Sequence, residues 1–212
     1  MTDLNEREER VSLRETLGGE PDPDFTLVLP PGWQRRAVTQ AEQDRMIGEM
    51  RGRLLTAHRP ELYARMRQLT TEAFTQMRKV STVAMFLPVG EDALYLPASI
   101  TASILHAEAG ANLDPLVRTM IDRDGATPLL GDKRILRAER QTTQSLDGET
   151  AAVTTVVHLT PVPGSERRRA LQLTTVIVHP TDVPADDPPL VAMKALVDVC
   201  ASTLSWLPAP TP

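Results

Sequence analysis

Residues 133–179 read KRILRAERQTTQSLDGETAAVTTVVHLTPVPGSERRRALQLTTVIVH, and they predict three consecutive β-strands. Residues 133–146 alternate between polar and apolar side chains, which is the two-residue period of a half-buried strand. Asp147-Gly148 follows as the favoured two-residue hairpin turn, because both of its central residues adopt positive φ. Ala151–Thr160 then predicts the returning strand, and the β-branched run Leu171–His179 predicts a third strand after a wider turn.

Three more strands are predicted upstream of this stretch. Leu94–His106 alternates with the same two-residue period, and Val80–Leu87 is β-branched and apolar. Phe25–Leu29 also alternates and runs into Pro30-Pro31-Gly32, so it predicts a first strand that a turn closes. Strands joined by short turns pair antiparallel, so the sequence predicts one mainly antiparallel sheet of about six strands.

Two helices are predicted between the first and second strands. Thr39 and Glu42 have the spacing of a capping box, in which the hydroxyl accepts from a free backbone N–H. Two apolar stripes at helical spacing follow and predict helices over 39–57 and 60–78. Pro60 lies between them, where it suits the first turn of a new helix.

Two further helices are predicted towards the C-terminus. Asp114-Pro115 opens a short helix that Gly125 ends, and we expect four of its residues to face inward: Leu116, Val117, Met120 and Ile121. The last helix presents an apolar stripe of Leu190, Met193, Val197, Cys200 and Leu204. The fold class is therefore α+β, with helices packed on one sheet, including an inserted two-helix segment and a C-terminal helix.

Length and composition define the organisation of the chain. The 212 residues fit one α+β domain over 25–212, which a flexible acidic arm over 1–24 precedes. The single cysteine excludes an intrachain disulfide and a CxxC-type zinc site. Cys200 lies on the apolar stripe of the last helix, so we expect a buried and unreactive thiol.

The charge balance and the absence of targeting segments restrict partners and compartment. A net charge of −5 argues against a nucleic-acid binder, and three Phe, two Trp and two Tyr provide few stacking platforms. No stretch has the apolar length of a signal peptide or a transmembrane helix, so we expect a cytoplasmic protein that does not insert into a membrane. Lysine occurs only at Lys79, Lys133 and Lys194, and this strong preference for arginine is typical of GC-rich bacterial coding.

The sequence contains none of the common catalytic or cofactor-binding motifs. GxGxxG after a strand, GxxxxGK[ST], HExxH, GxSxG and the EF-hand loop are all missing, so we expect no cofactor, no bound metal and no enzyme activity. His158 and His179 lie on strands that are predicted to pair, but the sequence does not determine their register or their faces. A metal or acid–base role would need a third ligand or an orienting carboxylate.

Arginines are the strongest candidate partner-binding residues. An Arg-Arg-Arg run follows a turn, and together with nearby arginines it predicts a basic edge in an otherwise acidic protein; the candidates are Arg134, Arg137, Arg140, Arg167, Arg168 and Arg169. The alternative is a solvated strand edge whose charges discourage edge-to-edge pairing.

Two segments resemble the PsbP-like superfamily, which includes Mog-type proteins, LpqN-type proteins and bacterial chaperones for secreted effectors. Phe25–Trp33 resembles its entry of a strand followed by Pro-x-Gly-Trp. The run of antiparallel strands and the closing helix with Ser202–Trp206 resemble its end. The resemblance implies a scaffold that binds other proteins and has no shared catalytic site, so it assigns no site residue to this chain. The two-helix insertion at 39–78 and the lack of a lipoprotein signal depart from the pattern.

Two functional hypotheses follow from the sequence. The first is a non-enzymatic protein-binding module, an adaptor or chaperone linked to a bacterial secretion system, with another protein as its partner; whether the chain also forms a homodimer is left open. The second is a small-molecule-binding protein or small enzyme that uses a cavity between the sheet and its helices. Its candidate polar groups are His106, His158, Arg137 and Glu139.

Overall fold

The structure is a computed structural model that describes residues 23–89, 94, 96–146 and 149–207. Its elements follow one another as β1 (Phe25–Thr26), β2 (Trp33–Arg36), α2 (Gln40–Thr56), α3 (Pro60–Lys79), β3 (Thr82–Pro88), β4 (Ala98–His106), α4 (Asp114–Asp124), β5 (Thr127–Leu129), β6 (Asp132–Leu146), β7 (Glu149–Pro161), β8 (Arg169–Pro180), α5 (Pro188–Ser202) and β9 (Ser205–Trp206). Residues 1–22, which form most of the predicted acidic arm, lie outside the described residues.

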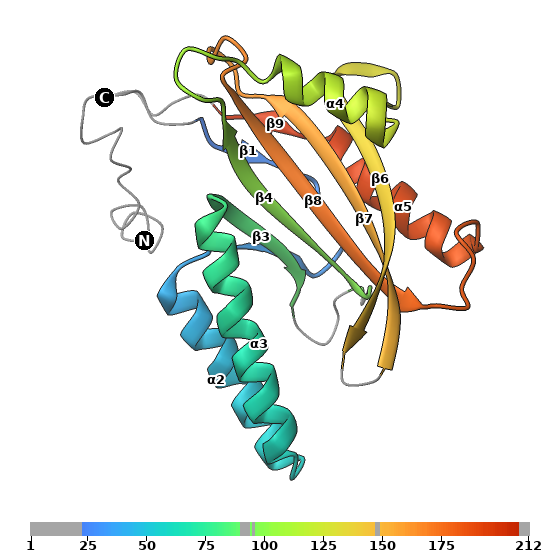
Figure 1. Cartoon of the computed structure of the whole chain (residues 1–212). Coiled ribbons are helices and arrows are strands. Elements are labelled where there is room, and N and C mark those ends of the chain that lie inside the picture. The colour runs from blue at the N-terminus through green and yellow to red at the C-terminus, as the bar shows by residue number, and fades with distance from the viewer. Residues whose placement is uncertain (1–22, 90–93, 95, 147–148, 208–212) are drawn as a thin grey trace.

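Seven strands form one antiparallel sheet in the order β2-β3-β4-β8-β7-β6-β5, and β1 pairs with β9 in a second, two-stranded sheet (Figure 1). This confirms the α+β class, the mainly antiparallel sheet and the C-terminal helix. The longest pairing joins β6 to β7, with an unbroken register from Leu136 opposite Leu159 to Leu146 opposite Glu149. The predicted Asp147-Gly148 turn between these strands lies outside the described residues.

One face of the sheet packs against α5 and the small β1–β9 sheet. Side chains alternate along a strand, so Leu171 and Leu173 point to this face, where they form one apolar core with Val197 of α5. Phe25 of β1 closes the core, because its ring lies 6.3 Å from that of Phe86 and 6.0 Å from that of Trp206, measured between centroids.

The opposite face carries α4 at one end and the α2–α3 helical hairpin at the other (Figure 1). Met120 of α4 packs into a small apolar cluster with Leu159 and Ala170. Phe74 of α3 packs into another cluster with Val38 and Met85. The stretch of sheet between the two clusters bears no helix among the elements that the structure describes.

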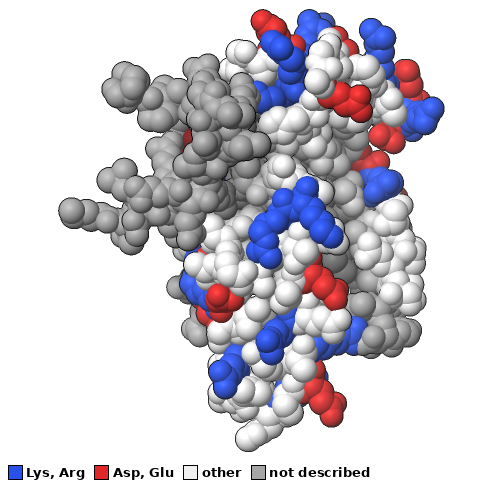
Figure 2. Space-filling view, turned by 60° about the vertical axis from the view of Figure 1, so that its left-hand side comes forward, with Lys and Arg blue, Asp and Glu red and all other residues white. Residues whose placement is uncertain are grey.

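The α2–α3 hairpin projects away from the sheet and forms the lower part of Figures 1 and 2. The Oγ1 of Thr39 accepts a 3.2 Å hydrogen bond from the Glu42 N–H, which confirms the predicted start of α2. The buried residues of the two helices are Gln43 and Phe74. The hairpin is therefore anchored through few side chains, and basic residues lie along its exposed surface (Figure 2).

Three short strands, β2, β5 and β9, were not predicted. They have four, three and two residues, which is too short for an alternating period to be recognised. The predicted strand over Phe25–Leu29 is wrong beyond Thr26, because its partner β9 is only two residues long. No helix of the described residues is long and apolar enough to cross a membrane.

Candidate functional site

Helix α4 lies across the sheet and creates the candidate site. Pro115 occupies its first turn, and Gly125 ends it in the left-handed conformation at φ 64°, as predicted. The Asp114 side chain does not cap the helix; Asn112 Oδ1 accepts a 3.0 Å hydrogen bond from the Asp114 N–H instead. Of the four residues expected to face inward, Met120 is buried and Val117 half-buried. Leu116 and Ile121 border open cavities between α4 and the sheet, so they are not buried and are 37% and 46% exposed.

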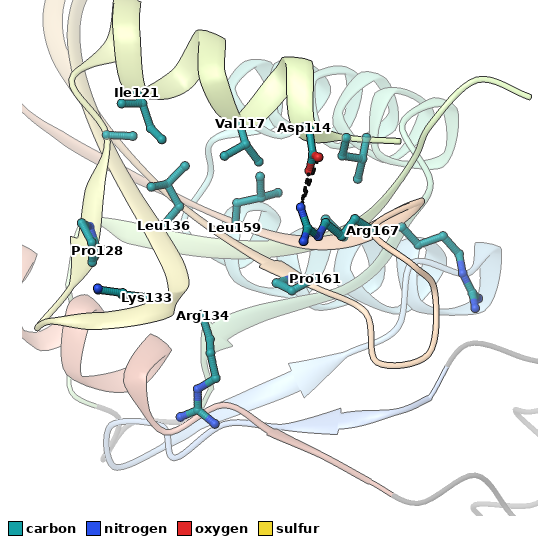
Figure 3. A pocket seen from close by; sticks show the side chains of 14 residues that line it. Asp114, Val117, Ile121, Pro128, Lys133, Arg134, Leu136, Leu159, Pro161 and Arg167 are labelled. Carbon is teal, nitrogen blue, oxygen red and sulfur yellow. Dashed lines mark hydrogen bonds and ion pairs between the residues drawn. The ribbon is translucent and has the colours of Figure 1, made fainter. Parts of the chain in front are cut away.

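A cavity of about 440 Å³ opens between α4, β5, β6, β7 and the start of β8 (Figure 3). Its walls are mostly apolar: Leu113, Val117, Ile121, Ala126, Pro128, Leu136, Leu159, Pro161 and Ala170. In Figure 3, Val117 and Ile121 descend from α4 towards Leu136 and Leu159, which rise from the sheet. The volume lies within the range of about 300–1,000 Å³ that is typical of small-molecule sites.

The charged residues that line this cavity are mostly basic: Lys133, Arg134, Arg167 and Arg169 against Asp114. The Arg167 guanidinium lies 3.2 Å from the Asp114 carboxylate, and the two meet at the mouth of the cavity (Figure 3). Lys133 forms no ion pair with any residue that the structure describes. Lys133 therefore supplies a positive charge that no described acid balances, beside an apolar interior.

Arg134 is held in place by its neighbour on β6. Its guanidinium donates to Asp132 at 2.7 Å, and its backbone N–H donates to the same carboxylate at 2.8 Å. The hydrogen bonds from the Arg134 side chain, with that from its backbone, lower the pKa of Asp132 to about 2. The pair thus stays charged across the ordinary pH range.

The six arginines predicted as partner-binding residues do not share one surface. Arg134, Arg167 and Arg169 line the α4 cavity. Arg168 is exposed and pairs with Glu166, and Arg140 is exposed on β6. Arg137 alternates to the opposite face of the sheet, so the structure separates it from the others.

Beneath α5, Arg137 belongs to a network of five charged or titratable side chains. His158 Nε2 lies 2.7 Å from Asp198 Oδ1, and Arg137 Nε donates to Oδ2 of the same carboxylate at 2.8 Å. The other end of Arg137 donates to Glu139 at 2.7 Å, and Lys194 donates to that glutamate at 3.0 Å. The network joins β6 and β7 to α5.

These contacts determine the titration of the two acids. Burial by itself raises the pKa of Asp198, but the hydrogen bonds from His158 and Arg137 outweigh it and hold that pKa below its usual value. Glu139 behaves in the same way, with Arg137 and Lys194 as its partners. Each carboxylate contacts two side chains of the network, and these contacts join α5 to β6 and β7.

The remaining candidate groups lie apart from one another. His158 stands opposite Leu173 and His179 opposite Ala152, so the two histidines are six positions apart, roughly 20 Å along the strands. His179 bonds to Thr154 at 3.0 Å and His106 is exposed. Among the described residues no group of His, Cys, Asp or Glu has the arrangement of a metal site. Cys200 is buried, and burial raises the pKa of its thiol.

The polar groups of the second hypothesis lie elsewhere than in the α4 cavity. His106, His158, Arg137 and Glu139 do not line it, and three of them belong to the α5 network. Glu139 also lines a smaller cavity between α4 and the sheet. Sequence reasoning missed the apolar wall, because residues from α4, β5, β6, β7 and β8 contribute to it. The one usable signal was the Leu116–Ile121 stretch, which has more apolar residues than one narrow contact stripe requires.

No protein-family model matches this sequence, and no curated protein is similar enough to be matched. Function therefore has to be argued from the chemistry of the site.

Proposed function

We propose that the protein binds a small apolar molecule carrying an anionic group in the α4 cavity. The observation that carries this proposal is a cavity of about 440 Å³ whose walls are mostly apolar and whose lining includes Lys133, a cation without an ion pair among the described residues. The apolar portion of the ligand lies between α4 and the sheet, where it is removed from water. Its carboxylate or phosphate pairs with Lys133, which lines the cavity and forms no ion pair with a described residue.

The test uses anilinonaphthalene sulfonate, a fluorescent apolar anion, as the probe. Ile121 lines the cavity on one side of α4, whereas Leu116, of similar exposure, lies on the other side. We expect Ile121→Trp to fill the cavity and weaken saturable probe binding by at least about tenfold, or about 1.4 kcal/mol. Leu116→Trp is the matched control and keeps the wild-type affinity. Equal losses in both variants, or no saturable binding by wild type, would refute the proposal.

Competition against the bound probe tests the charge of the ligand. Octanoate and octanol have similar apolar chains, but only octanoate pairs with the cations of the mouth. Hydrogen bonds to charged groups contribute about 1.5–3 kcal/mol, so octanoate should compete at least about tenfold better. Lys133→Gln should reduce that preference, and a preference unchanged by this substitution would exclude Lys133 as the anion partner.

A second candidate function is the protein-binding module, an adaptor or chaperone linked to a bacterial secretion system. The specific observation that favours it is a long, unprotected strand edge on β6, where residues 140–145 are exposed. Membership of the PsbP-like superfamily stays part of this proposal, since its relatives bind other proteins. The two functions use different surfaces of the same chain.

A further inference from the structure

The outer edge of β6 is unpaired over most of its length. β6 has 15 residues, but its outer neighbour β5 pairs with it only at Asp132, Leu136 and Arg137. From Ala138 to Leu146 no other described strand lies on that side of β6. A strand edge of this kind presents a row of backbone N–H and C=O groups that can pair with another chain.

This edge lacks the usual protection against added strands. Residues 138–146 read AERQTTQSL, with no proline and with charge only at Glu139 and Arg140. Their register with β7 is continuous, so no bulge twists the edge away. The strand at the other edge, β2, has only four residues, which is one of the ordinary ways to keep an edge from pairing.

A second cavity lies beside this edge. It measures about 230 Å³ and reaches from the β6 edge across the sheet to β8. Its apolar lining residues are Leu116, Met120, Ala138 and Val157, and its polar ones are Asp124, Glu139, Arg140, Thr155 and Gln172. In strand addition, main-chain hydrogen bonds provide affinity and pockets for alternate side chains provide specificity. The edge and the cavity together meet both requirements.

We propose that residues Ala138–Ser145 of β6 bind an extended segment of a partner protein as an added strand, with one apolar side chain in the α4–β6 cavity. This proposal rests on the protein-binding function stated above. The eight residues present roughly 25 Å of backbone. A second copy of this chain is the weaker fit, because its own edge from Glu139 to Ser145 is polar and has no side chain for the apolar part of the cavity, which Leu116, Met120 and Val157 form.

The probes are synthetic peptides selected on the full chain from a phage-displayed library of random dodecamers. Successive N–H groups of a strand point to opposite sides, so alternate amides of residues 138–145 point outward. We expect a bound peptide to slow hydrogen exchange at those alternate amides by at least about tenfold. A peptide bound against side chains alone would not produce this alternation.

Two proline variants test the edge directly. The N–H groups of Thr142 and Thr143 point to opposite sides of β6, one towards β7 and one outward. One of the variants Thr142→Pro and Thr143→Pro therefore removes an outward donor and leaves the hydrogen bonds to β7 intact. The variant with the smaller loss in thermal stability identifies the outward position. In that variant we expect peptide affinity to fall at least about tenfold, while binding of anilinonaphthalene sulfonate in the α4 cavity remains unchanged.

The cavity variants provide a reciprocal control. Leu116→Trp fills the α4–β6 cavity and should weaken peptide binding, whereas Ile121→Trp should not. If the outward proline does not change the affinity of a selected peptide, and the peptide protects amides outside residues 138–145, the edge proposal is wrong. The protein-binding function is not contradicted by that result. If no peptide that binds the full chain can be selected, that result contradicts both the edge proposal and the protein-binding function. A concentration-dependent dimer that the outward proline abolishes would assign the edge to a second copy and overturn the partner proposal.

Discussion

Asp198→Ala is expected to destabilise the protein by about 3 kcal/mol. The substitution removes the partner of His158 Nε2, whose side chain is 2% exposed, and of Arg137 Nε, and Arg137 keeps only its bond to Glu139. This value lies at the low end for broken buried pairs, because the side chains of Arg137 and Asp198 keep 21% and 15% of their exposure. The midpoint of urea unfolding measures the change.

The matched control is Asp132→Ala. Asp132 also binds an arginine of β6, but Arg134 is 85% exposed and water replaces the lost contact. We expect no measurable shift in its unfolding midpoint. If Asp198→Ala leaves the midpoint as close to wild type as Asp132→Ala does, the network does not fasten α5.

The same network predicts how stability depends on pH. The pKa of Asp198 is lower in the folded protein than in the unfolded chain, where an aspartate titrates near about 3.9. Its contribution is therefore complete above that unfolded value and is lost as pH falls through the folded pKa. The difference in unfolding midpoint between wild type and Asp198→Ala should be smaller at pH 3 than at pH 5.

The contrast between the β6–β8 strands and this network shows what the sequence can determine. The strands were predicted closely, because each is long and repeats its own two-residue period. The network depends on which faces of β6 and β7 lie under α5, and Asp198 is 40 residues from His158 and 61 from Arg137. Asp198 was not predicted, because the sequence around a single acid on a helix does not show whether its carboxylate forms buried ion pairs with a sheet or is solvated.

The α4 cavity was predictable only in part, for a related reason. Arg134, Arg167 and Arg169 were predicted as binding residues from their local density, and the structure brings those three to one cavity. The apolar wall was missed, because the apolar residues of α4 were read as one core-facing stripe. In the structure that stripe divides: Met120 reaches the sheet, and Leu116 and Ile121 border cavities on either side.

Phe74→Ala is expected to release the α2–α3 hairpin while the sheet stays folded. Phe74 is 1% exposed and is the one large apolar side chain that α3 buries fully, in a cluster with Val38 and Met85. Phe→Ala changes in cores cost about 3–5 kcal/mol. The hairpin projects from the sheet and has few other buried side chains (Figure 1). The lost free energy should therefore weaken the packing of the hairpin on the sheet and leave the free energy of global unfolding nearly unchanged.

Hydrogen exchange distinguishes local release of the α2–α3 hairpin from a loss of stability of the whole domain. We expect exchange in α2 and α3 to accelerate by about 100-fold, corresponding to about 3 kcal/mol, while the amides of β7 and β8 keep their protection. Met66→Ala is the control, since Met66 lies on α3 but is 38% exposed and lines no core cluster. Equal acceleration across the hairpin and the sheet would mean that Phe74 supports the common core. Acceleration confined to the hairpin would show that it docks as a separate cooperative unit, because the sheet residues in the Phe74 cluster, Met85 and Leu87, belong to β3.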